Sequence, residues 1–175
     1  MNTLLDNGTI ALRALEPTDL DRLLAWENDT ALWAVTDTIA PFSRHLIWQY
    51  LQDYDGDIYR MRQLRLVITR LADGAALGTV DLLNFDPLNN RAELGLFVAR
   101  DARGAGVGGQ AVDLVCDYVA RHLGIRQLYV HIAADNAPCL ELFRQKRFAE
   151  VGTLRQWVKR GTAYHDIVLM QRLFA

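Results

Sequence analysis

Four glycines stand within six residues, Gly104 to Gly109, in the stretch RDARGAGVGGQAVD. The stretch follows the apolar run LGLFVA and leads into a segment whose apolar residues recur at helical spacing. Glycines leave the backbone N–H groups of a loop uncovered, and the N-terminus of a helix adds a favourable potential for an anion. The sequence therefore predicts a phosphate-binding loop.

Two common phosphate loops can be compared with this stretch, and the first fits poorly. The Walker-type loop needs Lys and Ser or Thr after its last glycine, where this chain has Gln110 and Ala111, so the charge that would hold the β- and γ-phosphates is missing. A dinucleotide pattern, G-x-G-x-x-G, starts at Gly104, and Asp135 lies near the position of a ribose-binding acid. The elements around the loop decide between this pattern and others.

Strand patterns outnumber helix patterns around the loop. Antiparallel strands joined by turns such as Asp73-Gly74 precede the loop, and a helix that ends near Gly124 follows it. The expected strands are TIALRAL, LRLVITRLA, LGTVDLLNF, AELGLFVA, QLYVHIA, FAEVGTLRQWV and AYHDIVLMQRL. The expected helices begin at Pro17, after Ser43, after the glycine loop and near Asn136. The helix after Ser43 is expected to carry an apolar stripe of Leu46, Ile47, Tyr50, Leu51 and Tyr54. A dinucleotide-binding fold opens with its glycine loop and repeats βαβ units, so this order argues against it.

The spacing Arg103-x-x-Gly106-x-Gly108 resembles the acetyl-CoA signature of the GNAT (Gcn5-related N-acetyltransferase) superfamily. The stretch NAPCLELFRQKRFAEVG is similar to the family's second signature, and the element order resembles that of the family across essentially the whole chain. The resemblance implies one α+β domain over residues 1–175, an α/β sandwich in which about four helices flank a mixed, mostly antiparallel sheet of about seven strands. It also implies an enzyme that uses acetyl-CoA, releases CoA and acetylates an amine directly, without a covalent intermediate.

The resemblance also implies where the cofactor binds. In the family the pyrophosphate of CoA lies over the glycine loop, and the matching backbone N–H groups here are those of Arg103, Gly104, Ala105, Gly106, Val107 and Gly108. Charge-assisted hydrogen bonds are worth about 1.5–3 kcal/mol each, and we expect a side chain at Gly106 or Gly108 to push the phosphate out of reach. The pantetheine arm is expected along the strand segment Leu96–Val98, where Phe97 and Val98 are its contacts, and at Asn136, which would also cap its helix.

An amine must lose a proton before it attacks a thioester, which costs about 4 kcal/mol near pH 7 for an alkyl ammonium. Glu93, in RAELG, is the expected base or water-organising carboxylate, and the alternative is a structural carboxylate paired with Arg91 or another arginine. Many relatives carry a tyrosine acid where this chain has Phe143, which has no proton to donate. Cys139, one helical turn earlier, is the candidate acid, with a small hydrophobe as the alternative. His131, on a buried strand, is expected to be structural.

Charge is distributed unevenly along the chain. Residues 1–57 carry ten acidic and three basic residues, a net charge of −7, whereas the remainder carries 16 basic and 11 acidic residues, a net charge of +5. The first two helices form the acceptor side in the family, so the acidic excess would suit a polycation through ion pairs and cation–π contacts. The alternative is that the charged residues form solvated surfaces and that the tryptophans of this segment fill the core. The expected substrate-binding residues are Glu27, Trp33, Asp37 and Asp81.

Within the family, the chain most resembles the spermidine and diamine N-acetyltransferases and next the ribosomal-protein N-terminal acetyltransferases. The similarity lies in ALRALEPTDL, RAELG, LGIRQLYVHIAADN and the final hairpin. We therefore expect a polyamine or diamine, such as spermidine, as the small-molecule acceptor. A protein N-terminus as acceptor stays open, and so does a CoA-binding module that has lost catalysis, because Phe143 replaces the usual acid.

Composition limits the remaining classes. No apolar run approaches the roughly 20 residues of a membrane span, and the N-terminal stretch MNTLLDNGT lacks the features of a signal peptide, so we expect a cytoplasmic protein without a membrane partner. A net charge of −2 argues against nucleic-acid binding. Cys116 and Cys139 form neither a disulfide framework nor a metal spacing, and Asp53–Asp57 departs from a calcium loop. No metal is expected, and homo-oligomer formation stays open.

Overall fold

The computed structural model describes residues 4–36 and 38–175. Its strands are β1 (Ile10–Arg13), β2 (Leu64–Arg70), β3 (Ala76–Asp86), β4 (Arg91–Val98), β5 (Gln127–Ala133), β6 (Ala149–Arg160) and β7 (Ala163–Leu173). Its helices are α1 (Leu20–Glu27), α2 (Trp33–Thr36), α3 (Arg44–Asp53), α4 (Ile58–Met61), α5 (Val107–Tyr118) and α6 (Ala137–Gln145). A 3-10 turn, Pro17–Asp19, precedes α1, and a π-helical turn, Val119–Leu123, extends α5.

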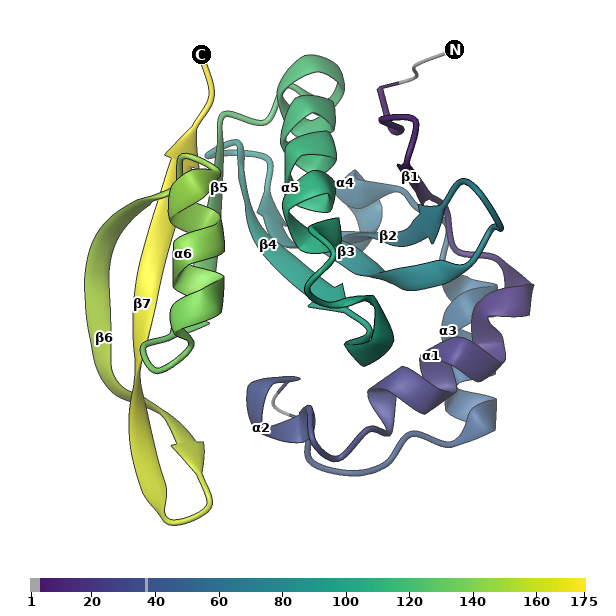
Figure 1. Ribbon diagram of the computed structural model, residues 1–175, viewed down its shortest axis with the longest axis horizontal. Coiled ribbons are helices and arrows are strands. Elements are labelled where there is room, and N and C mark those ends of the chain that lie inside the picture. The colour runs from purple at the N-terminus through teal and green to yellow at the C-terminus, as the bar shows by residue number, and fades with distance from the viewer. Residues whose placement is uncertain (1–3, 37) are drawn as a thin grey trace.

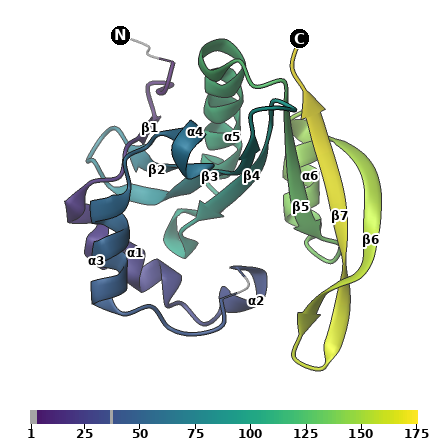
Figure 2. The ribbon, with the colours of Figure 1, turned by 180° about the vertical axis from the view of Figure 1, so that it is seen from behind.

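The seven strands form one open, twisted sheet in the order β1-β2-β3-β4-β5-β7-β6. Neighbouring strands are antiparallel except β4 and β5, which are parallel. Helices α5 and α6 cover one face of the sheet, and α1 and α3 pack against each other beside the first strands (Figures 1 and 2). The hairpin of β6 and β7 extends beyond the rest of the molecule (Figure 2).

The hydrophobic core lies between α5 and the sheet. On α5, Ala111, Val112 and Val115 are fully buried, and the sheet contributes buried residues such as Leu128 from β5. The stripe that the sequence predicts on α3 is only partly correct, because Leu46 is 48% exposed whereas Ile47 is buried. Among the described residues, no helix is long and apolar enough to cross a membrane.

Local sequence signals set the ends of the main helices. The Ser43 side chain accepts a hydrogen bond from Leu46 N and caps α3. Asn136 caps α6 in the same way through Cys139 N. At Gly124 the backbone enters the left-handed region, with φ 63°, which ends the α5 segment where the sequence predicts.

Candidate active site

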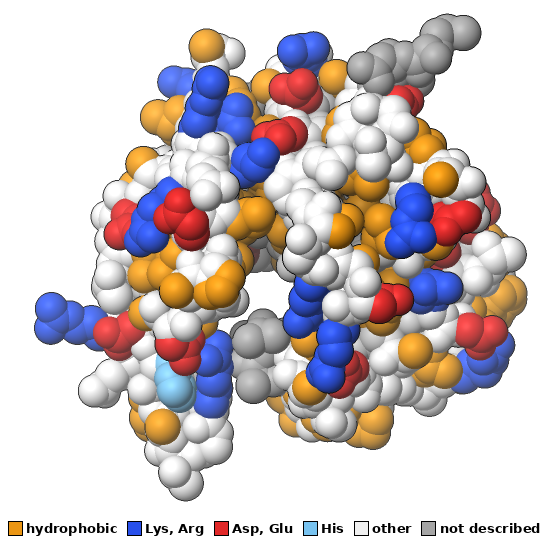
Figure 3. All heavy atoms as spheres, in the orientation of Figure 1, with side chains coloured by type: hydrophobic (Ala, Val, Ile, Leu, Met, Phe, Trp, Pro, Cys, Tyr) orange, Lys and Arg blue, Asp and Glu red, His pale blue; other side chains and the backbone are white. Residues whose placement is uncertain are grey.

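Strands β4 and β5 part in the middle of the sheet. Their ladder spans only Arg91↔Gln127 to Glu93↔Tyr129. Beyond it β4 stays with β3 and β5 stays with β7, so the two halves of the sheet diverge (Figure 1). The edge of β4 from Leu94 to Val98 that would face β5 therefore has no strand partner, which leaves backbone groups of this edge for a ligand. The space-filling view shows a gap between the two halves of the molecule here (Figure 3).

The glycine loop lies at the end of β4 and begins α5. Gly106 is the N-cap of α5 with φ 75°, and no side chain caps the helix there. The first helical hydrogen bond runs from Gln110 N to Gly106 O, at 3.1 Å. The N–H groups of Val107 and Gly108 precede that bond and have no partner inside the helix. This is the arrangement that binds a phosphate group at a helix N-terminus, so the loop fits the CoA pyrophosphate that the sequence predicts.

The two signature glycines have different reasons to be glycine. Gly106 needs its left-handed backbone, and Gly104 does so too, with φ 78°. A Cβ on Gly108 would instead lie 3.5 Å from Leu96 Cδ2 and 3.6 Å from Val98 Cγ2, on the sheet side of the helix. Such a side chain would therefore point at the sheet and meet it at ordinary contact distances, so we expect it to displace a bound phosphate less than a side chain at Gly106 would.

Basic side chains flank the loop. Arg103 Nε donates to Val98 O at 2.9 Å, which uses one backbone acceptor of the β4 edge. Lys146 Nζ pairs with Asp113 at 2.5 Å beside the first turn of α5. Arg100 and Arg103 also line a cavity of about 410 Å³ together with Trp26, Asp29, Leu32, Phe97, Ala99 and Asp101. The cavity thus joins the end of β4 to α1 and the turn after it.

Glu93 lies at the closed end of the opening between β4 and β5, and its side chain is 20% exposed. His131 Nδ1 lies 2.7 Å from Glu93 Oε1, and Asn84 Nδ2 donates to Glu93 Oε2 at 2.8 Å. Arg91, the partner considered from the sequence, instead pairs with Asp86 at 3.2 Å. The carboxylate is therefore held by an imidazole and an amide.

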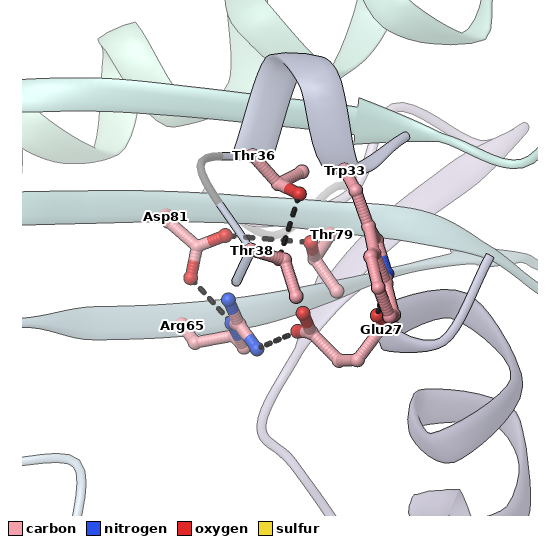
Figure 4. Close-up of polar contacts among 7 residues, drawn as sticks. All are labelled: Glu27, Trp33, Thr36, Thr38, Arg65, Thr79 and Asp81. Atoms are coloured by element: carbon pink, nitrogen blue, oxygen red, sulfur yellow. Dashed lines mark hydrogen bonds and ion pairs between the residues drawn. The ribbon is translucent and has the colours of Figure 1, made fainter. Parts of the chain in front are cut away.

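Two of the predicted acceptor residues meet on one arginine. Arg65 Nε donates to Asp81 Oδ1 at 2.5 Å, and Arg65 Nη1 donates to Glu27 Oε1 at 2.9 Å (Figure 4). The Arg65 guanidinium also lies over the Tyr50 ring, 5.8 Å from its centroid. Burial on its own would lower the pKa of Arg65, but the Asp81 carboxylate outweighs it and raises the pKa, so the group stays charged. Burial raises the pKa of Tyr50 to about 12, so its hydroxyl stays neutral.

The other predicted acceptor residues have separate environments. Trp33 Nε1 donates to the backbone oxygen of Glu27 at 3.0 Å, which fastens the start of α2 to the end of α1 (Figure 4). Asp37 lies outside the described residues. In the acidic loop after α3, Asp57 caps α4 by accepting from Tyr59 N and Arg60 N.

The candidate acid lies on α6. Burial raises the pKa of the Cys139 thiol to about 11, and transfer of its proton to an ordinary thiolate of pKa about 8.5 is therefore uphill. Phe143 is buried and packs edge-on against Phe148, with ring centroids 5.0 Å apart. The α6 helix therefore presents no strong acid at either position.

Two residues of this region, Arg65 and Asn84, are absent from the sequence prediction. Arg65 alternates with Leu64 and Leu66 in a buried strand, and a lone arginine in such a run needs a buried partner. That signal was present in the sequence. The sequence contains no such signal for Asn84, because its contact with Glu93 depends on the pairing of β3 with β4.

Comparisons with known proteins agree with this architecture. A family model described as the acetyltransferase (GNAT) domain matches residues 9–148. The chain is 26% identical to the candidate ribosomal N-acetyltransferase YdaF of Bacillus subtilis, over 93% of this chain and 90% of that protein. It is 24% identical to a spermidine N(1)-acetyltransferase of Vibrio cholerae, over 94% of this chain and 92% of that protein.

The fold is also similar to solved structures. The crystal structure of spermidine N-acetyltransferase from Vibrio cholerae in complex with CoA and spermine superposes with a TM-score of 0.86, over 95% of this chain and 96% of that chain, at 22% identity. The predicted fold class is confirmed.

Proposed function

The chain belongs to the GNAT acetyltransferase family, whose members use acetyl-CoA, and on this premise we propose that it acetylates a primary amine of a polyamine or diamine such as spermidine. The observation that carries the proposal is the opening between β4 and β5, which has the glycine loop at its mouth and Glu93 at its closed end. An opening of this kind brings an acyl donor, along the β4 edge, to a carboxylate that faces the acceptor.

The residues that would hold the cofactor follow from the free backbone groups. The N–H groups of the loop from Arg103 to Gly108 would bind the pyrophosphate, and the unpaired β4 edge, which includes Phe97 and Val98, would bind the pantetheine arm. Asn136 lies across the opening at the start of α6 and uses its side-chain oxygen to cap that helix, so its amide N–H₂ group is the part left for the arm. When bound, acetyl-CoA supplies the acetyl thioester.

The acceptor side carries excess negative charge. Asp81 and Glu27 share the single guanidinium of Arg65, which leaves one net negative charge in that cluster. Asp81 pairs with Gly95 on β4, and Glu93 is the next residue of β4 whose side chain lies on the same face. An ammonium group bound against this face would be attracted by both carboxylate positions. Trp33 at the start of α2 would add an aromatic wall.

Two kinds of relative support different amines. Spermidine N(1)-acetyltransferases of Escherichia coli and Vibrio cholerae favour a polyamine acceptor. The Bacillus subtilis relative favours a protein N-terminus, as an alternative. The acidic excess of residues 1–57 favours the polyamine, because a substrate with several positive charges gains more from that excess than a single α-amine does.

An amine panel tests the proposal. Thiol release from acetyl-CoA would be followed with spermidine, diamines of different lengths and N-terminal peptides, with Glu93→Gln as the control variant. We expect kcat/KM to be highest for a polyamine or diamine and to fall at least 100-fold in Glu93→Gln. Turnover of peptides without turnover of polyamines would reject the polyamine proposal and favour the ribosomal type. Tight acetyl-CoA binding without turnover of any amine would favour a module that has lost catalysis.

A further inference from the structure

Both oxygens of Glu93 are occupied by partners from neighbouring strands. His131 Nδ1, from β5, lies 2.7 Å from Oε1, and Asn84 Nδ2, from β3, lies 2.8 Å from Oε2. The three residues therefore form a hydrogen-bonded chain across β3, β4 and β5, at the point where β4 and β5 part. A carboxylate held in this way is well suited to orient a neighbour.

The backbone is shaped to bring Asn84 to that carboxylate. Leu83 pairs with Glu93, so in a regular strand the next side chain would turn to the opposite face. The β3–β4 register shifts between Leu83 and Asp86, and Asn84 has φ 49°, in the left-handed region. Such a bulge re-aims a side chain and is common next to active sites. The bulge thus places the amide on the same carboxylate as the imidazole.

The hydrogen bonds determine which nitrogen of His131 carries the proton. An ionised carboxylate only accepts hydrogen bonds, so Nδ1 is the donor, and in the neutral ring Nε2 then carries the lone pair. Within the described part of the chain, Glu93 is the sole hydrogen-bonding partner of the ring. The His131 side chain is 34% exposed, so the ring is not sealed in the core.

The other groups around the ring are neutral or are paired elsewhere. The Tyr129 ring lies edge-on to His131 at 5.6 Å, and burial, helped by the Glu93 charge, raises the pKa of Tyr129, which therefore stays neutral. On β3 and β4, the charged groups other than Glu93 are paired: Arg91 with Asp86, and Asp81 with Arg65 of β2. Across from His131 and Tyr129, β7 contributes the uncharged residues Leu169 and Gln171.

We propose that His131 is the group that moves the proton during acetyl transfer, and that Glu93 and Asn84 are positioning residues that fix its tautomer and orientation. The proposal rests on the acetyltransferase activity but not on which amine is used. One proton of the ammonium leaves to water. His131 Nε2 accepts the second from the attacking nitrogen as the C–N bond forms, and returns it to the sulfur as the C–S bond breaks. One side chain then serves as base and as acid, so Phe143 and Cys139 need not donate a proton.

A pH profile of matched variants tests the proposal. His131→Gln, Glu93→Gln and the double variant would be compared with His122→Gln, which changes a histidine at the far end of the α5 segment. With the best acceptor of the panel at saturation, we expect kcat of the unaltered protein to rise with pH as the base loses its proton. His131→Gln should lower kcat by about 10²–10⁴-fold and remove that rise. The double variant should be no slower than His131→Gln, because the two residues act as a unit.

Binding and rate measurements separate catalysis from structure. We expect the acetyl-CoA dissociation constant of His131→Gln to stay within about twofold of the unaltered protein, a difference below about 0.4 kcal/mol. A variant that loses binding and rate together would show a structural role and overturn the proposal. So would a His131→Gln variant that keeps its rate while Glu93→Gln is inactive, because Glu93 itself would then be the base.

The tautomer of His131 can be measured without any substrate. Long-range 1H–15N correlation spectra of the protein alone near neutral pH should show His131 protonated at Nδ1, and His131→Gln identifies the signal. A ring protonated at Nε2 would overturn the proposal even if no amine in the panel were acetylated. The spectrum therefore decides this inference separately from the choice of acceptor.

Discussion

At the scale of single residues, neither cysteine has the surroundings of a reactive thiol. Burial raises the pKa of Cys139 to about 11 and that of Cys116 to about 12. The thiolate is the reactive form, and at pH 8 a thiol of pKa 11 is ionised about 200 times less than one of pKa 8.5. We therefore expect a thiol-modifying disulfide reagent to react with the folded protein about two orders of magnitude more slowly than with the unfolded chain.

The same shifts set a direction for stability. A thiol whose pKa is raised by folding contributes stability that is complete below the pKa of the unfolded thiol and is lost as the pH rises toward the folded value. Replacement of both cysteines by alanine should therefore make denaturant stability less sensitive to pH between about pH 8.5 and 11.

The Cys139→Ala variant should also keep kcat within about threefold of the unaltered protein. A fast-reacting Cys139, or a loss of rate above 100-fold, would restore it as the acid.

The residues around Glu93 and Arg65 show what the sequence could indicate at this scale. Glu93 could be chosen because a family motif marks its position. Its partners His131 and Asn84 depend on a short parallel ladder and on a bulge, which are properties of the folded sheet. Arg65 was more accessible to prediction, since a charge inside an apolar strand requires a counter-charge. Its two partners come from α1 and β3, far apart in sequence, and could not be paired in advance.

At the scale of elements, the β4–α5 loop offers a matched pair of substitutions. Gly106 has φ 75°, so Gly106→Ala forces a side chain into a left-handed backbone and should cost about 1 kcal/mol of stability. The N–H groups at the start of α5 would shift with it, and acetyl-CoA affinity should fall about tenfold or more, equivalent to about 1.4 kcal/mol. Calorimetric titration with acetyl-CoA measures the loss.

Gly108→Ala is the control for that loop. Its Cβ would meet Leu96 and Val98 at ordinary contact distances, and Gly108 lies in the first turn of α5 with no positive φ. The substitution should leave affinity within about threefold, and it should leave stability unchanged or raise it by about 0.4–1 kcal/mol. Equal losses of affinity in the two variants would contradict the view that backbone conformation at Gly106 shapes the binding loop.

Most elements could be predicted because they carry strong periodicity or caps. Strand β5 and helix α6 match the expected segments, and Ser43, Gly124 and Asn136 mark helix ends as expected. The four-residue helices α2 and α4 were not predicted, because a single turn is too short to show a helical repeat. The divergence of β4 from β5 has no signal in the sequence. Both strands look regular in sequence, and they separate because β4 stays paired with β3 and β5 stays paired with β7.

At the scale of the whole molecule, the acidic excess of the first third is partly cancelled in the fold. Asp19 pairs with Arg13 from the same segment, whereas Asp55 and Glu27 pair with Arg60 and Arg65 from beyond it. The cavity beside the end of β4 is also mixed, since acidic and basic side chains both line it. On the proposed function, attraction of a polycation would therefore come from the summed field of the acidic first third more than from any single carboxylate.

This view predicts how the substrate constants respond to salt. The Debye length falls from about 10 Å at 0.1 M salt to about 3 Å at 1 M, so a summed field is screened far more than a direct contact. We expect the KM of spermidine to rise several-fold over that range, and to rise more steeply than the KM of a monoamine of similar length, because the polyamine carries more charges into the same field. Initial rates at saturating acetyl-CoA, measured over a series of ionic strengths, give the slope of KM against salt for each of the two amines. Parallel slopes for the two amines would mean that the acidic first third does not attract the acceptor, and a salt-independent KM for both would place recognition in short-range contacts alone.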